Sequence, residues 1–459
     1  MTETTNAIRY YSTNARVPEV SLAEALLEGQ AADRGLYLPT CFPTLTADDF
    51  RAMGNMTYAQ IAFAVLRHFT TGMIDDEKLR ALCDDAYDFD VPLEHVAGRR
   101  YLLRLDRGPT ASFKDFAARM MARWMSVLVK ERDGDLVILT ATSGDTGSAV
   151  AHAYHKIDRI RVVVLFPIKE VSDRQRRQMT TLGDNVTTIG IEGQFDDCQA
   201  MVKQAFSDKL LADIRLSSAN SINIGRLLPQ TVYYVYAYAK LADHDGREQM
   251  IVSVPSGNFG NMMGCCIARR MGLPVKRLVI ATNANDEVPA FIRSGQYERI
   301  SPSRVCISNA MNVGHPSNLT RLVDLYGGWM NETGKLIRPL DMAWLHSDLY
   351  AVSISDDETR ATITNAHREF GVMLEPHGAV GWAGLERYLQ DTAGAADTLA
   401  VSVETAHPAK FPDEIQAALG IVPDLPPSLA GLEDRTEDYA VMPAEYEPFR
   451  DLLLKRFAK

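Results

Sequence analysis

Hydrophobic and polar positions divide the chain into two regions of different periodicity. In the first hundred or so residues, apolar side chains recur at helical spacing, as in the stretches 58–69 and 75–85. Ser21 and Glu24 form the pattern of a capping box, in which each side chain satisfies a backbone donor of the other at a helix start. We therefore expect a mostly helical N-terminal region, in which a helix begins after Ser21 with Leu22, Ala25, Leu26 and Gly29 at helical spacing, and the unit ends at 35–39.

From Tyr101 onward, short apolar runs alternate with longer amphipathic stretches. Short continuous runs are typical of strands buried on both faces, and strand–helix alternation is typical of parallel sheets. A long helix expected at 227–241 separates the runs into two groups. The pattern predicts an α/β fold: two parallel-sheet units with helices on both faces. The predicted strands are 101–105, 136–142, 161–167, 186–191, 250–255, 278–283 and 399–404, and the main helices between them are 116–129, 149–156, 197–211 and 227–241.

The chain is long enough for two or three domains. We expect an N-terminal domain at 1–98, a catalytic core of two α/β subdomains at 99–420, and a C-terminal extension at 421–459. The extension begins with a proline-rich connection and is predicted to end in a helix with Pro448 at its first position, where a missing backbone N–H does no harm.

Composition narrows the classes of partner. The chain is 46% hydrophobic and 23% charged, as soluble globular proteins are, and 48 Lys+Arg against 59 Asp+Glu leave a net charge of −11. Such a field repels nucleic acid and anionic membranes, so an anionic ligand requires a local cluster of donors. The N-terminus lacks the apolar segment of a signal peptide, and no charge-free apolar run is long enough to cross a membrane. We expect a cytoplasmic protein with neither nucleic-acid nor membrane partners.

The six cysteines show neither a disulfide framework nor the C-x-x-C spacing of a zinc or redox site. We expect buried thiols in a reducing compartment and no metal.

Two glycine-rich turns follow predicted strands, where parallel sheets bind ligands. The turn at 142–147 offers hydroxyls and a helix N-terminus to an anion, although a plain strand-to-helix turn explains it equally well. The turn at 255–261 lacks the P-loop lysine and the third glycine of a dinucleotide fingerprint. Its backbone amides suit a single phosphate monoester. The alternative is a tight structural turn.

Two further segments carry candidate side chains. Lys114 opens an amphipathic helix between two phenylalanines, where desolvation would lower the pKa of its amine and suit it to covalent bonding with a carbonyl. Local sequence alone favours an ordinary exposed lysine. The segment after the last predicted strand offers the Thr405 hydroxyl to a ring nitrogen and the Lys410 charge to an anion, while His407 has the pattern of a structural imidazole.

Nine motifs run in order along the chain: YST at 11–13, GLYLP at 35–39, GPTASFKDF at 108–116, TSGDTG at 142–147, NSINIGR at 220–226, VPSGNFGN at 254–261, VGHPSN at 313–318, HGAV at 377–380 and TAHPAKF at 405–411. Together they resemble the threonine synthases of the type with a long N-terminal domain found in bacteria and fungi. That family belongs to the tryptophan-synthase-β-like, fold type II enzymes that use pyridoxal 5′-phosphate.

The resemblance implies the roles of the cofactor-binding residues. Lys114 would bind the cofactor covalently, Asp145 would lie beside the phenolic oxygen of its ring, and Thr405 would hydrogen-bond the pyridine nitrogen. A hydroxyl does not hold that nitrogen protonated, which predicts a restrained electron sink. The 5′-phosphate would lie against Gly257, Asn258, Phe259, Gly260 and Asn261.

The implied substrate is O-phospho-L-homoserine, which the family converts with water to L-threonine and phosphate in the last step of threonine biosynthesis. Its phosphate would contact Asn220, Ser221 and Arg226, with the hydroxyls of Ser143 and Thr146. Lys114 would then act as general base and acid. A phospho-lyase that releases 2-oxobutanoate and a non-catalytic ligand-sensing homologue stay as alternatives. Both a monomer and a homodimer fit the sequence.

Overall fold

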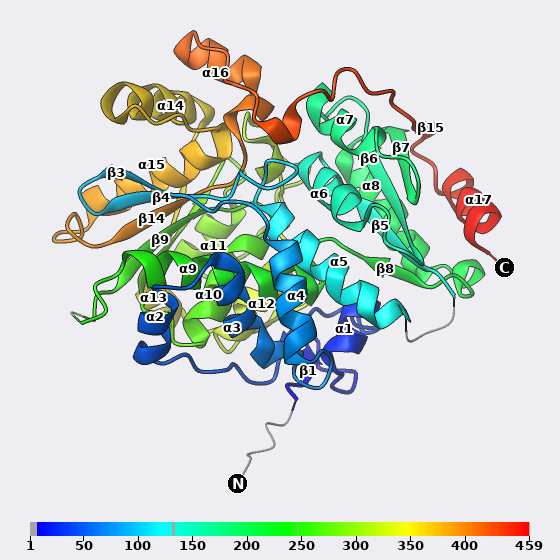
Figure 1. Cartoon of the computed structure of the whole chain (residues 1–459), viewed down its shortest axis with the longest axis horizontal. Coiled ribbons are helices and arrows are strands. Elements are labelled where there is room, and N and C mark those ends of the chain that lie inside the picture. The colour runs from blue at the N-terminus through cyan, green and yellow to red at the C-terminus, as the bar shows by residue number, and fades with distance from the viewer. Residues whose placement is uncertain (1–6, 131–133, 246, 459) are drawn as a thin grey trace.

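The computed structural model describes residues 7–130, 134–245 and 247–458 and contains two large, mainly parallel sheets (Figure 1). The first sheet is formed by β5 (Leu136–Ala141), β6 (Ile160–Pro167), β7 (Val186–Glu192), β8 (Leu216–Ser218) and β15 (Ala440–Pro443). Its spatial order is β15-β7-β6-β5-β8, and every neighbouring pair is parallel. The helices between its strands are α6 (Asp145–Tyr154), α7 (Asp173–Thr180) and α8 (Phe195–Ser207).

The second sheet has six strands: β3 (Leu93–Ala97), β4 (Arg100–Arg104), β9 (Met250–Pro255), β10 (Val275–Thr282), β13 (Leu349–Ser353) and β14 (Ala400–Glu404). Its order is β13-β10-β9-β14-β4-β3, parallel except for the β3–β4 hairpin at one edge. Every residue of β5, β9 and β14 is buried, which explains their unbroken apolar pattern. All seven predicted strands are present.

Helices surround the second sheet and connect it to the rest of the chain. Near the chain's middle, the expected helix at 227–241 is wrong in its first part, because Pro229 has no backbone N–H to continue a helix and two 3-10 turns precede α9. The helices are α5 (Lys114–Lys130), α9 (Thr231–Leu241), α10 (Gly260–Arg270), α11 (Glu287–Ser294), α12 (Leu319–Leu325), α13 (Met342–Asp348), α14 (Asp356–Phe370), α15 (Pro376–Asp391) and α16 (Pro412–Leu419). The short 3-10 turns are Lys209–Leu211, Ile224–Arg226, Leu228–Gln230, Asn309–Met311, Pro408–Lys410 and Pro427–Leu429, and a two-stranded sheet joins β11 (Trp329–Met330) to β12 (Leu336–Arg338).

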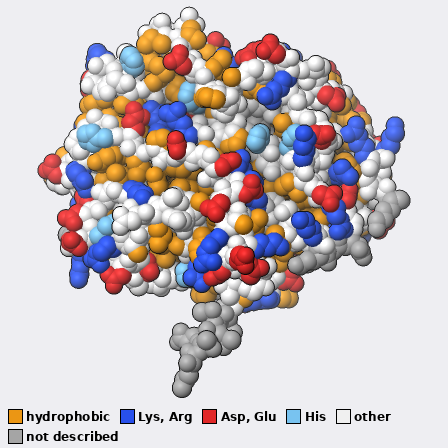
Figure 2. All heavy atoms as spheres, in the orientation of Figure 1, with side chains coloured by type: hydrophobic (Ala, Val, Ile, Leu, Met, Phe, Trp, Pro, Cys, Tyr) orange, Lys and Arg blue, Asp and Glu red, His pale blue; other side chains and the backbone are white. Residues whose placement is uncertain are grey.

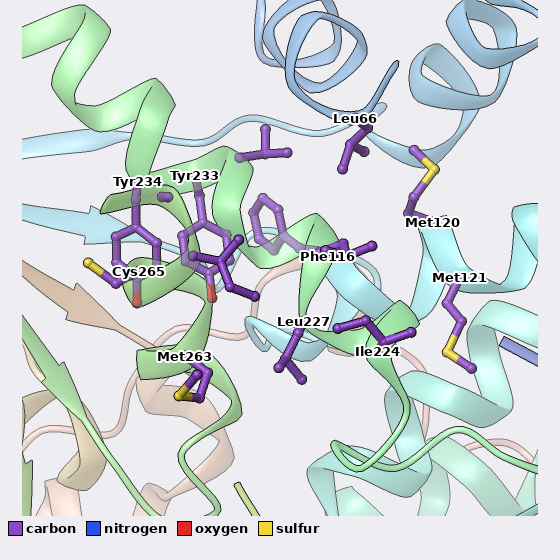
Figure 3. Close-up of a cluster of buried hydrophobic side chains, with 14 of the residues drawn as sticks. Leu66, Phe116, Met120, Met121, Ile224, Leu227, Tyr233, Tyr234, Met263 and Cys265 are labelled. Carbon is purple, nitrogen blue, oxygen red and sulfur yellow. The ribbon is translucent and has the colours of Figure 1, made fainter. Parts of the chain in front are cut away.

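The N-terminal region is mostly helical, as expected, and also contains a small antiparallel sheet. The predicted capping box at Ser21 is present: its hydroxyl accepts from the Glu24 amide, and the Glu24 carboxylate accepts from the Ser21 amide. Figure 3 shows where this region joins the core, with Leu66 facing the α5 side chains Phe116 and Met120. The elements of this region are β1 (Tyr10–Ser12), α1 (Leu22–Glu28), β2 (Tyr37–Pro39), α2 (Ala47–Met53), α3 (Tyr58–Thr70) and α4 (Asp76–Ala86).

The C-terminal segment returns to the first sheet instead of standing apart from it. β15 adds a strand beside β7, and α17 (Tyr446–Phe457) packs Phe449 and Leu453 into the cluster between α8 and that sheet. The predicted terminal helix is present but starts two residues before Pro448. Pro448 is therefore its third residue, still within the first turn, where backbone N–H groups lack helical partners.

The surface carries charged side chains of both signs. Acidic and basic side chains are interspersed over the face drawn in Figure 2. Within the described ranges, no helix is both long and apolar enough to cross a bilayer, and His, Cys, Asp and Glu nowhere gather as a metal-binding group. All six cysteines are free thiols; five are buried, but Cys41 is exposed because it lies in the loop after β2, so the expectation of burial is wrong there.

Candidate active site

Three chain segments of the candidate site follow strand ends. The turn at 142–144 follows β5, the turn at 256–259 follows β9, and Thr405 follows β14. The Phe113 amide donates to the Thr405 carbonyl at 2.8 Å, which sets the start of α5 beside the end of β14. This is the edge at which parallel α/β sheets bind ligands.

Lys114 is the first residue of α5 and is half-buried in a chain region that is otherwise mostly buried. Its Nζ lies 5.5 Å from the centre of the Phe113 ring, whereas Phe116 turns into the core against Tyr58 and Tyr233. Only one of the two flanking phenylalanines therefore faces the amine. Burial lowers the pKa of Lys114 to about 8, the direction expected, and the charges of Lys410 and Arg226 lower it further against the opposing effects of Asp145 and Glu375.

Asp145 is a buried carboxylate with cationic and amide partners. Lys410 Nζ lies 2.7 Å from Asp145 Oδ1 and donates to the Thr110 carbonyl at 2.9 Å, so the anion that Lys410 faces is Asp145. Gln175 Nε2 donates to the same carboxylate oxygen at 2.9 Å. Burial raises the pKa of Asp145, but the ammonium groups of Lys410 and Lys114 outweigh it and hold the pKa well below its ordinary value. Asp145 is ionised beside Lys114.

The turn after β9 has the features of an anion cradle. Gly257 lies so close to Met311 that a Cβ would come within 2.9 Å of Met311 Cα, and Phe259 has a left-handed φ of 63°. The 11-residue helix α10 starts at Gly260, so the first amides of this helix face the turn without helical acceptors. Asn261 accepts hydrogen bonds from Tyr233 and Tyr234 through Oδ1, and its buried Nδ2 has no partner within the described residues. These backbone and side-chain donors fit a phosphate group.

The segment at 220–226 lies between this cradle and the turn after β5. Asn220 Nδ2 donates to the Ala141 carbonyl at 2.9 Å, at the end of β5. Asn318 Nδ2 donates both to the Ser221 carbonyl at 3.3 Å and to the Asn258 carbonyl at 2.9 Å. The side chains predicted to contact two different phosphates are thus brought to neighbouring loops.

Arg226 is buried and is not a surface arginine. Its Nη1 donates to the Ala219 carbonyl at 2.6 Å, while its Nε is buried without a partner in the part of the chain that the structure describes. Burial lowers the pKa of Arg226 to about 10, opposed by Tyr154, Asp115 and Tyr233. An unused guanidinium donor in a buried place suits an oxyanion.

Ser143 and Thr146 are half-buried on the turn after β5. The turn itself is fixed by Thr142, whose hydroxyl accepts from the amides of Gly144 at 2.9 Å and Gly147 at 2.7 Å. His407 has the predicted structural role, because its Nδ1 accepts from the Ala409 amide at 3.1 Å.

Three residues at this site were not predicted. Gln175 belongs to a capping box on α7, and Glu375 accepts from Thr405 Oγ1 at 3.1 Å as the N-cap of α15. Arg321 is completely buried on α12 and has no carboxylate within ion-pair distance in the described chain. Burial lowers the pKa of Arg321 to about 9. Their positions in the sequence could have pointed to them. Glu375 and Arg321 each lie within three residues of a quoted motif, and Gln175 is the third residue after the capping-box serine Ser172.

Arg321 joins four of the quoted motifs. It donates to the Tyr37 carbonyl at 3.0 Å, to the Ser221 carbonyl at 3.1 Å and to the Ile222 carbonyl at 2.7 Å. It also donates to Asn318 Oδ1 at 2.6 Å, the side chain that holds Asn258. The N-terminal region, the segment at 220–226 and the cradle after β9 are therefore positioned through a single guanidinium.

Comparison with known proteins agrees with this fold. A family described as "Pyridoxal-phosphate dependent enzyme" matches residues 92–404, and the families described as "Threonine synthase N terminus" and "Threonine synthase, C-terminal" match residues 9–87 and 378–453. The chain is 37% identical to a threonine synthase of Pseudomonas aeruginosa over 465 residues, covering 95% of this chain and 96% of that protein. It is 36% identical to that of Escherichia coli, covering 97% and 99%.

Solved structures give the same result. A structure described as pyridoxal-phosphate-bound threonine synthase from Brucella melitensis superimposes with a TM-score of 0.90 at 35% identity, covering 99% of this chain and all of that one. The yeast threonine synthase superimposes with a TM-score of 0.88 at 29% identity, covering 98% of both. The chain is thus a fold type II, pyridoxal-phosphate-dependent enzyme. Within that class, it belongs to the threonine synthase family.

Proposed function

We propose that this enzyme converts O-phospho-L-homoserine and water to L-threonine and phosphate. The observation that carries the proposal is the pairing of two anion-suited places on neighbouring loops, one of which, Arg226, is close enough to Lys114 to lower the pKa of its amine. The cradle at 257–261 fits one phosphate, and the buried Arg226 guanidinium with its unpartnered Nε fits another. A phosphorylated substrate and a phosphorylated cofactor need two such places, and the net charge of −11 leaves no general attraction for either.

Each proposed site residue has a task that its chemistry allows. Bound pyridoxal 5′-phosphate supplies the electron sink that lets protons leave carbon atoms of an amino acid. Lys114 would hold the cofactor and, when released, remove and return protons, because a pKa near 8 keeps a useful fraction of both protonation states at neutral pH. Asp145 would lie by the phenolic oxygen, and Thr405 by the ring nitrogen.

The phosphate of the substrate would be held by Arg226 and the loops around it. A planar guanidinium presents paired donors to phosphate oxygens. Asn220, Ser221, Ser143 and Thr146 would add neutral donors that orient the phosphate without binding its product too tightly. Because the phosphate is also the leaving group, these donors would stabilise the charge that develops on it.

We also infer a cytoplasmic protein, because free thiols at all six cysteines suit a reducing compartment.

The test is product analysis with purified enzyme, pyridoxal 5′-phosphate and O-phospho-L-homoserine. The expected products are threonine and phosphate in equal amounts, and Lys114→Ala should abolish both. Borohydride reduction followed by peptide mapping should mark Lys114 and not Lys410, the second buried amine beside it. A main product of 2-oxobutanoate would instead identify a phospho-lyase, and an absence of turnover with retained ligand binding would identify a ligand-sensing protein.

A further inference from the structure

Gln175 lies completely buried on α7, against the turn that follows β5. Gly144, the N-cap of α6, has a positive φ of 130°, and a Cβ added to it would come within 2.5 Å of Gln175 Cδ. On the backbone side, the Ser148 hydroxyl donates to the Gln175 carbonyl at 3.1 Å. The Gln175 side chain is therefore confined between α6 and α7.

A backbone amide fixes which end of the Gln175 side chain faces Asp145. The Ser172 amide lies 3.2 Å from Gln175 Oε1, and a backbone N–H can only donate, so the carbonyl oxygen belongs at that end. The nitrogen Nε2 is then the atom 2.9 Å from Asp145 Oδ1. The opposite orientation would set two donors against each other at Ser172 and two acceptors at Asp145. Gln175 therefore donates to Asp145.

Asp145 Oδ1 receives a second donor from a different part of the fold. Lys410 Nζ lies 2.7 Å from the same oxygen and follows β14 of the second sheet, whereas Gln175 belongs to a helix of the first sheet. Among the residues that the structure describes, Asp145 Oδ2 has no hydrogen bond. Two donors anchored in different elements fix the direction of the carboxylate more closely than either does alone, and they leave Oδ2 for a ligand.

We propose that Gln175 is a positioning residue: with Lys410, it holds Oδ1 of Asp145 so that Oδ2 is presented to the phenolic oxygen of the bound cofactor. This inference rests on the proposed place of Asp145 beside that oxygen. A neutral amide suits the task, because a second cation next to Lys410 would lower the pKa of Lys114 further. Without Gln175, the carboxylate keeps only its bond to the Lys410 ammonium, a point charge that does not fix its direction.

The first test compares two glutamines of the same helix. Gln175→Met and Gln178→Met each remove one buried side-chain amide from α7, but Gln178 donates to the Thr110 carbonyl at 3.2 Å and has no hydrogen bond to Asp145 in the described part of the chain. The measurements are the visible absorbance spectrum of each holoenzyme without substrate and kcat for O-phospho-L-homoserine.

In Gln175→Met, the absorbance maximum of the bound cofactor should shift, because the phenolic oxygen is conjugated with the ring. Its kcat should fall about tenfold or more, as expected for the loss of a hydrogen bond to a charged group. Gln178→Met should keep the wild-type spectrum and nearly the wild-type kcat.

Gln175→Glu separates donation to Asp145 from packing. Glutamate suits the third position of a capping box as glutamine does, so the N-terminus of α7 is kept. The introduced carboxyl lies beside Asp145, which raises its pKa against the opposing charges of Lys410 and Lys114. While protonated it can donate to Asp145, and as the pH rises it loses that hydrogen. The ratio of its kcat to that of the wild type should therefore fall from about pH 6 to about pH 9.

A Gln175→Met enzyme with the wild-type spectrum and kcat, or a Gln178→Met enzyme that loses as much as Gln175→Met, would overturn the inference. If Gln175→Met does not fold, Gln175→Glu decides, and a reduced kcat that is the same fraction of wild type at both ends of the pH range contradicts the role of Gln175. If the wild type forms threonine in these cases, the proposed function stands and only the role of Gln175 fails. A wild type that forms no threonine contradicts the proposed function, and the spectra then still test Gln175.

Discussion

Lys114 has a pKa of about 8, so its reactivity should depend on pH in a range that is easy to reach. Only the free amine attacks a carbonyl, and its fraction falls about tenfold for each unit below the pKa. We expect the rate at which apoenzyme captures pyridoxal 5′-phosphate to rise steeply up to about pH 8 and then level off. Stopped-flow absorbance across pH 6–10 measures this profile.

Lys410→Met should move that profile to higher pH. Lys410 lowers the pKa of Lys114 by charge repulsion and also binds Asp145, which would otherwise face Lys114 alone. Lys335→Met, at an exposed position in the turn before β12, is the control. A profile that stays in place after Lys410 is removed would contradict this account of the two amines.

Arg226 should act on the substrate and leave the cofactor in place. Arg226→Leu removes charge-assisted hydrogen bonds worth a few kcal/mol, so we expect kcat/KM for phosphohomoserine to fall roughly 100-fold or more. Arg226→Lys keeps the charge without the planar fork and should lose less. Steady-state kinetics, together with cofactor titration of the same preparations, decide the question, with exposed Arg299→Leu as the control.

If Arg226→Leu no longer binds the cofactor, the two phosphate-binding places have been assigned the wrong way round.

Residues that lie in recognisable motifs could be proposed as site residues from the sequence, and residues whose contribution depends on a contact with another element could not. Lys114, Asp145 and Thr405 lie in motifs, and the structure brings them together. Gln175 looks like an ordinary third residue of a helix, which it also is, because it caps Ser172. Its bond to Asp145 exists only because α7 begins beside α6.

Among the elements, α12 is short but ties several others together through Arg321. A lysine cannot reach the carbonyls of Tyr37, Ser221 and Ile222 simultaneously, and each buried acceptor left unpaired costs about 1–3 kcal/mol. Arg321→Lys should therefore lower the free energy of unfolding by several kcal/mol. Because Asn318 would also lose a partner, Kd for the cofactor and KM for the substrate should rise together.

Thermal unfolding and cofactor titration test this, with Arg368→Lys on the exposed side of α14 as the control. If Arg321→Lys is destabilised but keeps its Kd for the cofactor and its KM for the substrate, Arg321 has a structural role only.

Strands could be predicted from the sequence where all their residues are buried, and the prediction failed where buried and exposed residues are mixed. The strands buried on both faces read as continuous apolar runs. β8, β13 and β15 were missed because they are short or only partly buried, and each is the outermost strand of its sheet. An edge strand is stabilised by the strand beside it, which its own sequence does not contain.

At the scale of the whole molecule, the C-terminal segment should stabilise the fold without taking part in catalysis. Phe449 is completely buried in the cluster between α17, α8 and the first sheet. Phe449→Ala should cost about 3–5 kcal/mol, lower Tm by several degrees and leave kcat nearly unchanged. Val441→Ala on β15, where the side chain is 54% exposed, should change Tm little. A large fall in kcat for Phe449→Ala at a temperature where it is folded would contradict this division.

The order of strands in the second sheet also bears on when, during its synthesis, the chain becomes able to bind the cofactor. β14 lies between β4 and β9, so residues 400–404 must leave the ribosome before strands made some 150 and 300 residues earlier acquire their shared neighbour. The contact between Phe113 and Thr405 forms at the same moment. A nascent chain therefore carries Lys114 through most of translation without the residues that complete its surroundings. We therefore expect only nearly complete chains to capture the cofactor and truncated products to remain without it.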